Sequence, residues 1–152
     1  MLYYEEEIGM VKTYSLKSDG ETLISTNFKV KEFACKDGTD KILIDIELVN
    51  ILQKYRDYIK KPIIIVSGYR TESHNQLVNG KINSYHLKGM AAQIKVDNVK
   101  CEDIANWFYI NGVKGIGIID DAGVRSVHID TRRDARFCFK QIDSEIIVVE
   151  KF

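Results

Sequence analysis

The sequence has no run of apolar residues long enough to cross a bilayer, so no membrane span is predicted. It also lacks an excess of positive charge: 22 lysines and arginines balance 22 aspartates and glutamates, which argues against a nucleic-acid partner. The N-terminus is acidic where a secretory signal would be basic, and no apolar segment follows it. We therefore expect synthesis in the cytoplasm without a signal peptide, and neither a nucleic-acid nor a membrane partner.

Cysteine is scarce too. Cys35, Cys101 and Cys138 lie far apart without paired spacing, which excludes a disulfide framework and a zinc ribbon. They fit small buried side chains in a reducing compartment. A chain of 152 residues is long enough for one domain with a substantial core. We expect a single domain over residues 26–152, preceded by an N-terminal arm or leader over residues 1–25, where periodicity is weak.

Hydrophobic periodicity predicts an α+β fold, with a mostly antiparallel sheet and helices packed on one side. Apolar residues at steps of three and four predict helices over 45–60 and 102–111, and a capping threonine predicts a short helix over 72–78. Strands are predicted over 63–66, 91–96, 115–119, 124–130 and 146–149. The continuous β-branched run 63–66 suggests a strand buried on both faces, and the last strand is expected at an edge or terminus.

One of these predicted strands contains a histidine, and another follows a loop that contains one. His86 lies in a loop that continues through a turn at Gly89 into a strand, whose period of two puts Gln93 on the face opposite Ile94. Further along the chain, the same period puts His128 and Asp130 together on one face of their strand. Two histidines from distant segments, with a carboxylate beside one of them, are typical ligands of a zinc site.

A set of motifs in fixed order supports this interpretation. The sequence resembles the zinc D-alanyl-D-alanine carboxypeptidase family, which includes VanY- and VanX-type peptidases and phage or prophage wall-lytic enzymes. The amino-terminal domain of hedgehog proteins is similar in fold. The resemblance covers roughly residues 12–136 and rests on Ser67-Gly68-Tyr69-Arg70-Thr71, Asn75, Ser84-x-His86-x-x-Gly89-x-Ala91-Ala92 and Val127-His128-x-Asp130-Thr131-Arg132.

The resemblance implies a hydrolase that cuts peptidoglycan stem peptides with one zinc ion, held by His, Asp and His. Carried across, these ligands fall at His86, position 93 and His128. Position 93 is glutamine in this chain, so the expected carboxylate is replaced by an amide. A neutral amide is a poorer zinc ligand than a carboxylate, because it brings no negative charge to the dication.

Other residues receive roles from the same resemblance. Arg70 would pair with the substrate carboxylate, and Ser84 and Tyr85 would donate or accept hydrogen bonds at the cleft wall. Many members carry an acid three residues before the second histidine, where this chain has Arg125. Asp130 is our candidate either for the general base or for a group that orients the His128 ring. Asp120 and Asp121 are weaker candidates for the base.

Two functions follow from these residues. The first is a prophage-encoded zinc metallopeptidase of the endolysin or carboxypeptidase type, reaching the bacterial cell wall after release or as part of a phage-like particle. The second is a catalytically inactive, metal-free relative that serves as a wall-binding or phage-tail structural module. Gln93 favours the second candidate. The first is favoured by the presence together of Arg70, Ser84, His86, His128 and Asp130.

Overall fold

The sheet that carries the predicted histidine strands has six strands in the order β3-β4-β6-β5-β7-β8. The computed structural model describes residues 10–152, and its first nine residues lie outside this description. Neighbouring strands are antiparallel except for β5 and β7, which run parallel. The elements in chain order are β1 (Val11–Ser15), α2 (Leu16–Asp19), η1 (Val30–Phe33), β2 (Lys41–Asp45), α3 (Ile46–Ile59), β3 (Ile64–Ser67), α4 (Glu72–Leu77), η2 (Tyr85–Lys88), β4 (Ala91–Lys95), α5 (Cys101–Ile110), β5 (Gly115–Asp121), β6 (Val124–Asp130), β7 (Phe137–Ile142) and β8 (Glu145–Val149).

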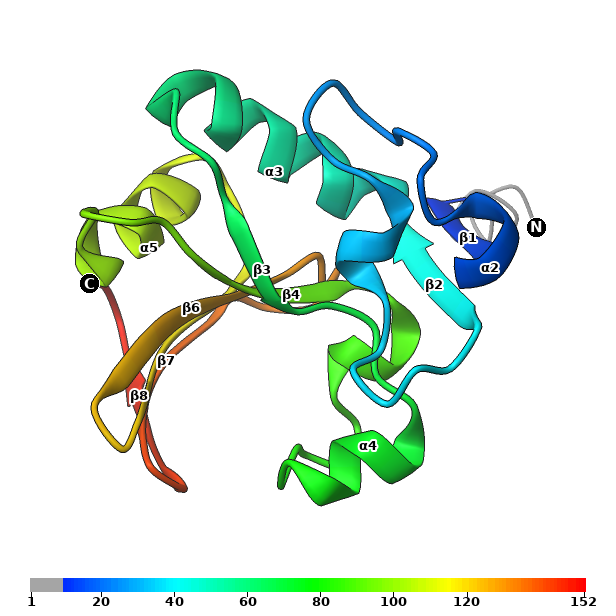
Figure 1. The fold of residues 1–152 in the computed structure, drawn as a ribbon. Coiled ribbons are helices and arrows are strands. Elements are labelled where there is room, and N and C mark those ends of the chain that lie inside the picture. Colours follow the sequence, from blue (N-terminus) through cyan, green and yellow to red (C-terminus); the bar gives the residue numbers. More distant parts are fainter. Residues whose placement is uncertain (1–9) are drawn as a thin grey trace.

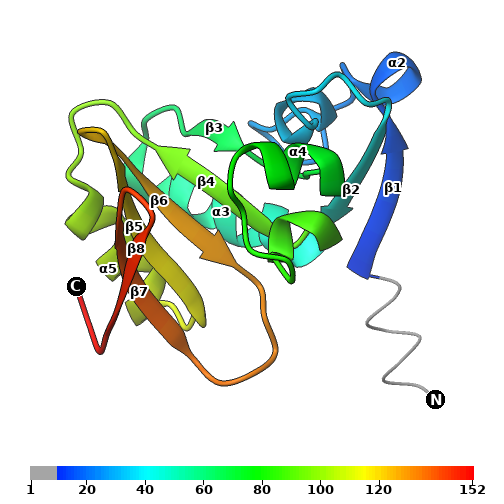
Figure 2. The same cartoon turned by 90° about the horizontal axis from the view of Figure 1, so that it is seen from below.

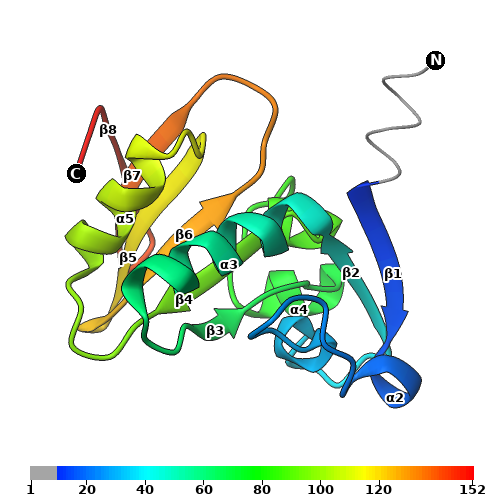
Figure 3. The same cartoon turned by 90° about the horizontal axis from the view of Figure 1, so that it is seen from above.

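The core lies between one face of this sheet and two helices. Helices α3 and α5 cover that face, while α4 lies on the other side of the sheet (Figures 1 and 3). Leu52 of α3 and Phe108 of α5 are fully buried, as are Ile94 and Ile129 on the facing strands. The predicted α+β class with a mostly antiparallel sheet is therefore confirmed, and the second face of the sheet is left for a site.

The helix boundaries follow local sequence signals. Asp45 caps α3 by accepting a hydrogen bond from the backbone N–H of Glu47 at 3.1 Å, and Thr71 caps α4 through the N–H of His74 at 3.2 Å. Both caps agree with the predicted starts. Helix α5 begins at Cys101, one residue before the predicted start, and Gly112 follows its end with a φ of 86°.

The predicted N-terminal arm, residues 1–25, lies partly outside the described residues. Its described part contains β1, which pairs with β2 in a separate two-stranded sheet at the side of the molecule (Figure 2). The next segment anchors the chain, because Phe28, Val30 and Phe33 are almost completely buried. Where the arm ends and the domain begins remains a prediction.

The strand predicted over 63–66 is β3, and its predicted burial on both faces is wrong. β3 forms one edge of the sheet, and Ile64 is 38% exposed while Ile65 is buried. An apolar β-branched run fits an edge strand as well as a central one, because β-branched side chains favour extended backbone in either position.

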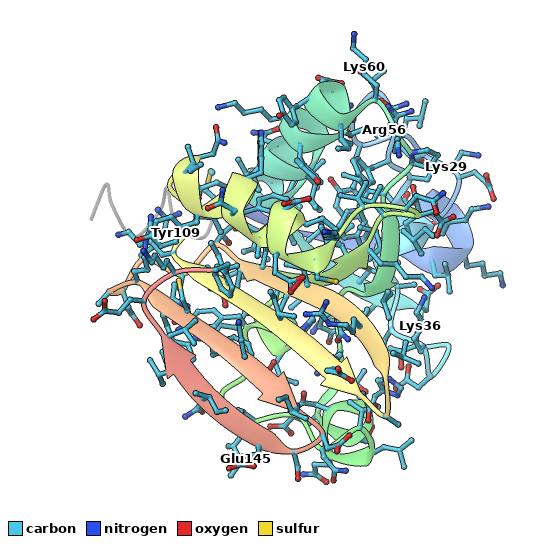
Figure 4. All side chains as sticks on the ribbon, turned by 90° about the vertical axis from the view of Figure 1, so that its left-hand side faces the viewer. Lys29, Lys36, Arg56, Lys60, Tyr109 and Glu145 are labelled. Carbon is cyan, nitrogen blue, oxygen red and sulfur yellow. The ribbon has the colours of Figure 1, made fainter. Side chains whose placement is uncertain are left out.

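The C-terminal strands extend the sheet on its other side. Figure 4 shows β6, β5, β7 and β8 side by side, with Glu145 at the start of β8. The edge position predicted for the last apolar run is confirmed, whereas β7 itself was not predicted. Within residues 10–152, no helix has the length and hydrophobicity that a transmembrane segment needs.

Candidate metal and peptide site

The sheet register brings the second histidine beside position 93. Gln93 of β4 is the partner of His128 of β6, which in turn faces Gly117 of β5. Phe139 of β7 continues the row. Because Gly117 has no side chain, the Phe139 ring lies over its Cα, where an added Cβ would overlap the ring. The Phe139 and His128 ring centres are 5.6 Å apart, so this phenylalanine forms one wall beside the imidazole.

His86 reaches the same face from the loop before β4. Ser84 caps the short η2 helix by accepting a hydrogen bond from the His86 N–H at 3.2 Å. Gly89 then turns the chain into β4 with a φ of 73°, tightly packed against the backbone of Leu43. The His86 side chain is only 2% exposed. The sequence from Ser84 to Gly89 therefore fixes the backbone position of this imidazole.

Hydrogen bonding also determines which His86 nitrogen can bind a metal. Nδ1 lies 2.7 Å from the carbonyl oxygen of Gly68 and must donate to it, which leaves Nε2 with a free lone pair. Burial lowers the pKa of His86 well below its ordinary value, and the positive charge of Arg70 lowers it further. The ring is therefore a neutral imidazole at physiological pH, which is the form that binds metals.

The two imidazoles converge. Their ring centres are 5.2 Å apart and their planes lie at 68°. Zinc–nitrogen bonds of about 2.1 Å in a tetrahedral site would put two imidazole centres roughly 5 Å apart. His86 and His128 therefore have the spacing of two ligands of one zinc ion.

The third ligand position does not fit as well. The Gln93 side-chain NH₂ donates to the Ser126 hydroxyl at 2.7 Å, and its Oε1 accepts a hydrogen bond from Arg70 Nη2 at 3.3 Å. The oxygen that would face a metal therefore faces a guanidinium. Within residues 10–152, no three side chains among His, Cys, Asp and Glu form a group able to hold a metal.

Arg70 is held by uncharged groups. Nε donates to the Ser67 hydroxyl at 3.0 Å, Nη1 donates to Asn75 Oδ1 at 3.3 Å, and Nη2 contacts Gln93 as described above. No carboxylate of residues 10–152 forms a salt bridge with Arg70. Desolvation lowers the pKa of this half-buried guanidinium. An anionic group entering beside Arg70 would meet an uncompensated positive charge.

Asp130 lies behind His128. Its Oδ2 is 2.7 Å from His128 Nε2, and Arg132 donates to both carboxylate oxygens at 2.7 Å. Although burial raises the pKa of Asp130, these hydrogen bonds outweigh that effect and hold the pKa well below its usual range. The side chain is completely buried. Of the two roles left open for Asp130, these contacts favour orientation of the His128 ring.

The predicted site residues meet in one cleft of about 1120 Å³. Its lining contains six of the seven predicted site residues: Arg70, Ser84, Tyr85, His86, Gln93 and His128. Asp130 is not part of the lining. Tyr85 has its hydroxyl directed to Asp134 Oδ2 at 3.1 Å, and Ser84 serves as the cap of η2.

Among the described side chains that line the cleft, the carboxylates are Asp121 and Asp143. Asp121 lies four residues along β5 from Gly117, the register partner of His128. At about 3.3 Å per residue, that separation is about 13 Å. Asp120 instead accepts a hydrogen bond from the N–H of Gly123 in the turn. Neither predicted weaker candidate therefore lies beside the two imidazoles.

The structure also identifies participants that the sequence reasoning did not assign. Ser126 lies within the strand predicted over 124–130 but received no role, and Arg132 was part of a quoted motif without a function. The period of two is the signal that could have identified Ser126, because it lies two residues before His128 on the same strand face. The role of Phe139 depends on the unpredicted strand β7 and had no comparable signal.

Comparison with protein families agrees with this geometry. A family model described as Peptidase M15 matches residues 23–130, which is more than half of the chain. The chain belongs to the Peptidase M15 family. The match ends at Asp130 and so includes both histidines, Gln93 and the Ser67–Arg70 segment. No individual curated protein matches the chain closely enough to add a second comparison. The coarse identification as a peptidase-family domain therefore rests on the family match.

Proposed function

We propose that this chain is a zinc-dependent peptidase that hydrolyses the stem peptides of peptidoglycan, as a D-Ala-D-Ala carboxypeptidase or an endolysin-type endopeptidase. One observation carries the proposal: His86 and His128 converge in one cleft of an M15-family domain. Prophage origin, and action at the cell wall after release or within a phage-like particle, belong to the same proposal and rest on the motif resemblance.

Each site residue would have a separate role in binding the metal or the peptide. His86 would hold zinc through Nε2 and His128 through Nδ1, and Gln93 Oε1 is the remaining, weaker donor. When bound, zinc would polarise the scissile carbonyl and activate a water molecule. Arg70 would pair with a carboxylate of the peptide, for which its planar fork is suited. Ser84 and Tyr85 lie at the wall where the peptide would pass.

Two observations favour the second candidate, a metal-free wall-binding or tail module. Gln93 Oε1 is already engaged by Arg70, whose positive charge disfavours a dication nearby. In addition, the carboxylates that line the cleft lie about four residues along the strands from the imidazole row, too far to take a proton from a water molecule there. A domain with these features would still recognise an anionic peptide through Arg70.

Comparing the natural chain with Gln93→Asp separates the two candidates. We expect zinc to bind both proteins, at least about tenfold more tightly to Gln93→Asp, because the carboxylate adds a charged oxygen donor. The zinc content of the purified proteins and hydrolysis of a peptide ending in D-Ala-D-Ala are measured together.

A double variant, Gln93→Asp with His128→Ala, is the matched control and should lose both zinc and turnover. Zinc and turnover found only in Gln93→Asp would assign the natural chain to the metal-free candidate. Absence of both from the natural chain and from Gln93→Asp would contradict the zinc proposal.

A further inference from the structure

Arg132 forms an unusually complete contact with one carboxylate. Its Nε and Nη2 each donate to Asp130 at 2.7 Å, and its backbone N–H donates to Asp130 Oδ1 at 3.1 Å. The Arg132 side chain is 16% exposed and that of Asp130 is completely buried. A two-pronged contact of this kind fixes the plane of the carboxylate as well as its position.

Two aromatic rings hold the guanidinium in place. Its central carbon lies 4.7 Å from the centre of the Tyr85 ring and 5.2 Å from that of Phe137. Tyr85 belongs to η2 and Phe137 begins β7, whereas Asp130 ends β6. The Tyr85 hydroxyl is itself held by Asp134. Arg132 therefore joins three segments that are separate in the sequence, and its rotation is restricted by both rings.

The contact between Arg132 and Asp130 also affects His128. Asp130 Oδ1 accepts from Arg132 twice, and Oδ2 accepts from Arg132 Nη2 and from His128 Nε2. Because the ionised carboxylate is an acceptor only, His128 must carry a proton on Nε2, so in the neutral imidazole Nδ1 is the nitrogen with the free lone pair. Loss of the Arg132 side chain would remove two of the four hydrogen bonds that Asp130 accepts and leave its carboxylate freer to rotate.

We propose that Arg132 is a positioning residue which, held between Tyr85 and Phe137 and acting through Asp130, fixes the orientation and tautomer of His128. The catalytic meaning of this role rests on the proposed function, but the role itself belongs to the metal-free protein. In this arrangement Tyr85 has a second role, because its ring packs against the Arg132 guanidinium.

The test observes the imidazole directly. In the metal-free protein, long-range ¹H–¹⁵N spectra of the histidine side chains are compared for the natural chain, Arg132→Gln and Arg132→Lys. We expect a single Nε2–H tautomer of His128 in the natural chain and a mixture of tautomers in Arg132→Gln. Arg132→Lys keeps the charge but not the two-pronged contact, so it should give an intermediate result. Zinc affinity should fall about tenfold to a hundredfold in Arg132→Gln.

Arg136→Gln is the matched control. Arg136 also stacks on a ring, with its central carbon 3.8 Å from the centre of Tyr109, but it contacts neither Asp130 nor His128. It should leave the His128 signals and the zinc affinity unchanged. A folded Arg132→Gln with unchanged His128 signals and unchanged zinc affinity would overturn the proposal.

If circular dichroism shows that Arg132→Gln does not fold, Tyr85→Leu replaces it, because this change removes one wall and keeps the ion pair. We expect a smaller shift of the His128 tautomer in the same direction, and unchanged signals would again overturn the proposal. None of these readouts requires hydrolysis, so an inactive protein would contradict the proposed function without affecting this inference.

Discussion

At the scale of single residues, the site depends on small side chains as much as on ligands. Gly115 and Gly117 lie on the site face of β5, and a Cβ at either position would overlap a neighbour: the carboxylate of Asp130 for Gly115, and the Phe139 ring for Gly117. The convergence of His86, Gln93 and His128 could be inferred from the period of two and from the motif. The glycine contacts could not, because they depend on which strand pairs with which.

The contact at Gly117 leads to a prediction about packing. Gly117→Ala should destabilise the fold by about 1–3 kcal/mol, because the Phe139 ring is buried and cannot move aside freely. Urea unfolding measures the change. Introducing Phe139→Leu in the same chain should recover part of the loss, since the smaller side chain leaves room for the new methyl group. If Gly117→Ala lowers the free energy of unfolding equally in the natural chain and in Phe139→Leu, the Phe139 ring is not the obstacle.

At the scale of elements, the connection between β5 and β6 sets the register that aligns Gly117 with His128. The strands predicted over 115–119 and 124–130 leave residues 120–123 for the turn, but Asp120 and Asp121 belong to β5 and the loop is only Ala122 and Gly123. Their φ angles are 51° and 86°, as in a type I′ turn. The two predicted strands locate the connection between them, whereas its length depends on the pairing of Asp121 with Val124.

Ala122 is a poor residue for this conformation, which yields the second stability prediction. Ala122→Asn should stabilise the fold by about 0.5–1 kcal/mol, because asparagine tolerates positive φ better than alanine does. Ala122→Val should destabilise it, because β-branched residues are strongly disfavoured there. Thermal unfolding of both variants checks the opposite signs. A gain from valine, or a loss from asparagine, would contradict the turn geometry.

At the scale of the whole molecule, the two faces of the six-stranded sheet have separate tasks. One face packs on α3 and α5 and forms the core, and the other carries the row from Gln93 to Phe139 within the cleft. The fold class could be predicted because helix and strand periods in this sequence are clear. The edge position of β3 and the existence of β7 could not, since neither apolar run reveals its neighbours. The motifs place the site residues in a fixed order along the chain and so carry information on which segments meet, whereas no comparable signal gives the sheet order.

The proposed zinc peptidase function requires one metal position between the two imidazoles. Crystals of the natural chain and of Gln93→Asp, each grown with zinc, are measured on both sides of the zinc absorption edge. We predict a single anomalous peak bonded to His86 Nε2 and His128 Nδ1 in both proteins, with higher occupancy in Gln93→Asp. Zinc bound elsewhere, or no zinc between these rings even in Gln93→Asp, would contradict the proposed function.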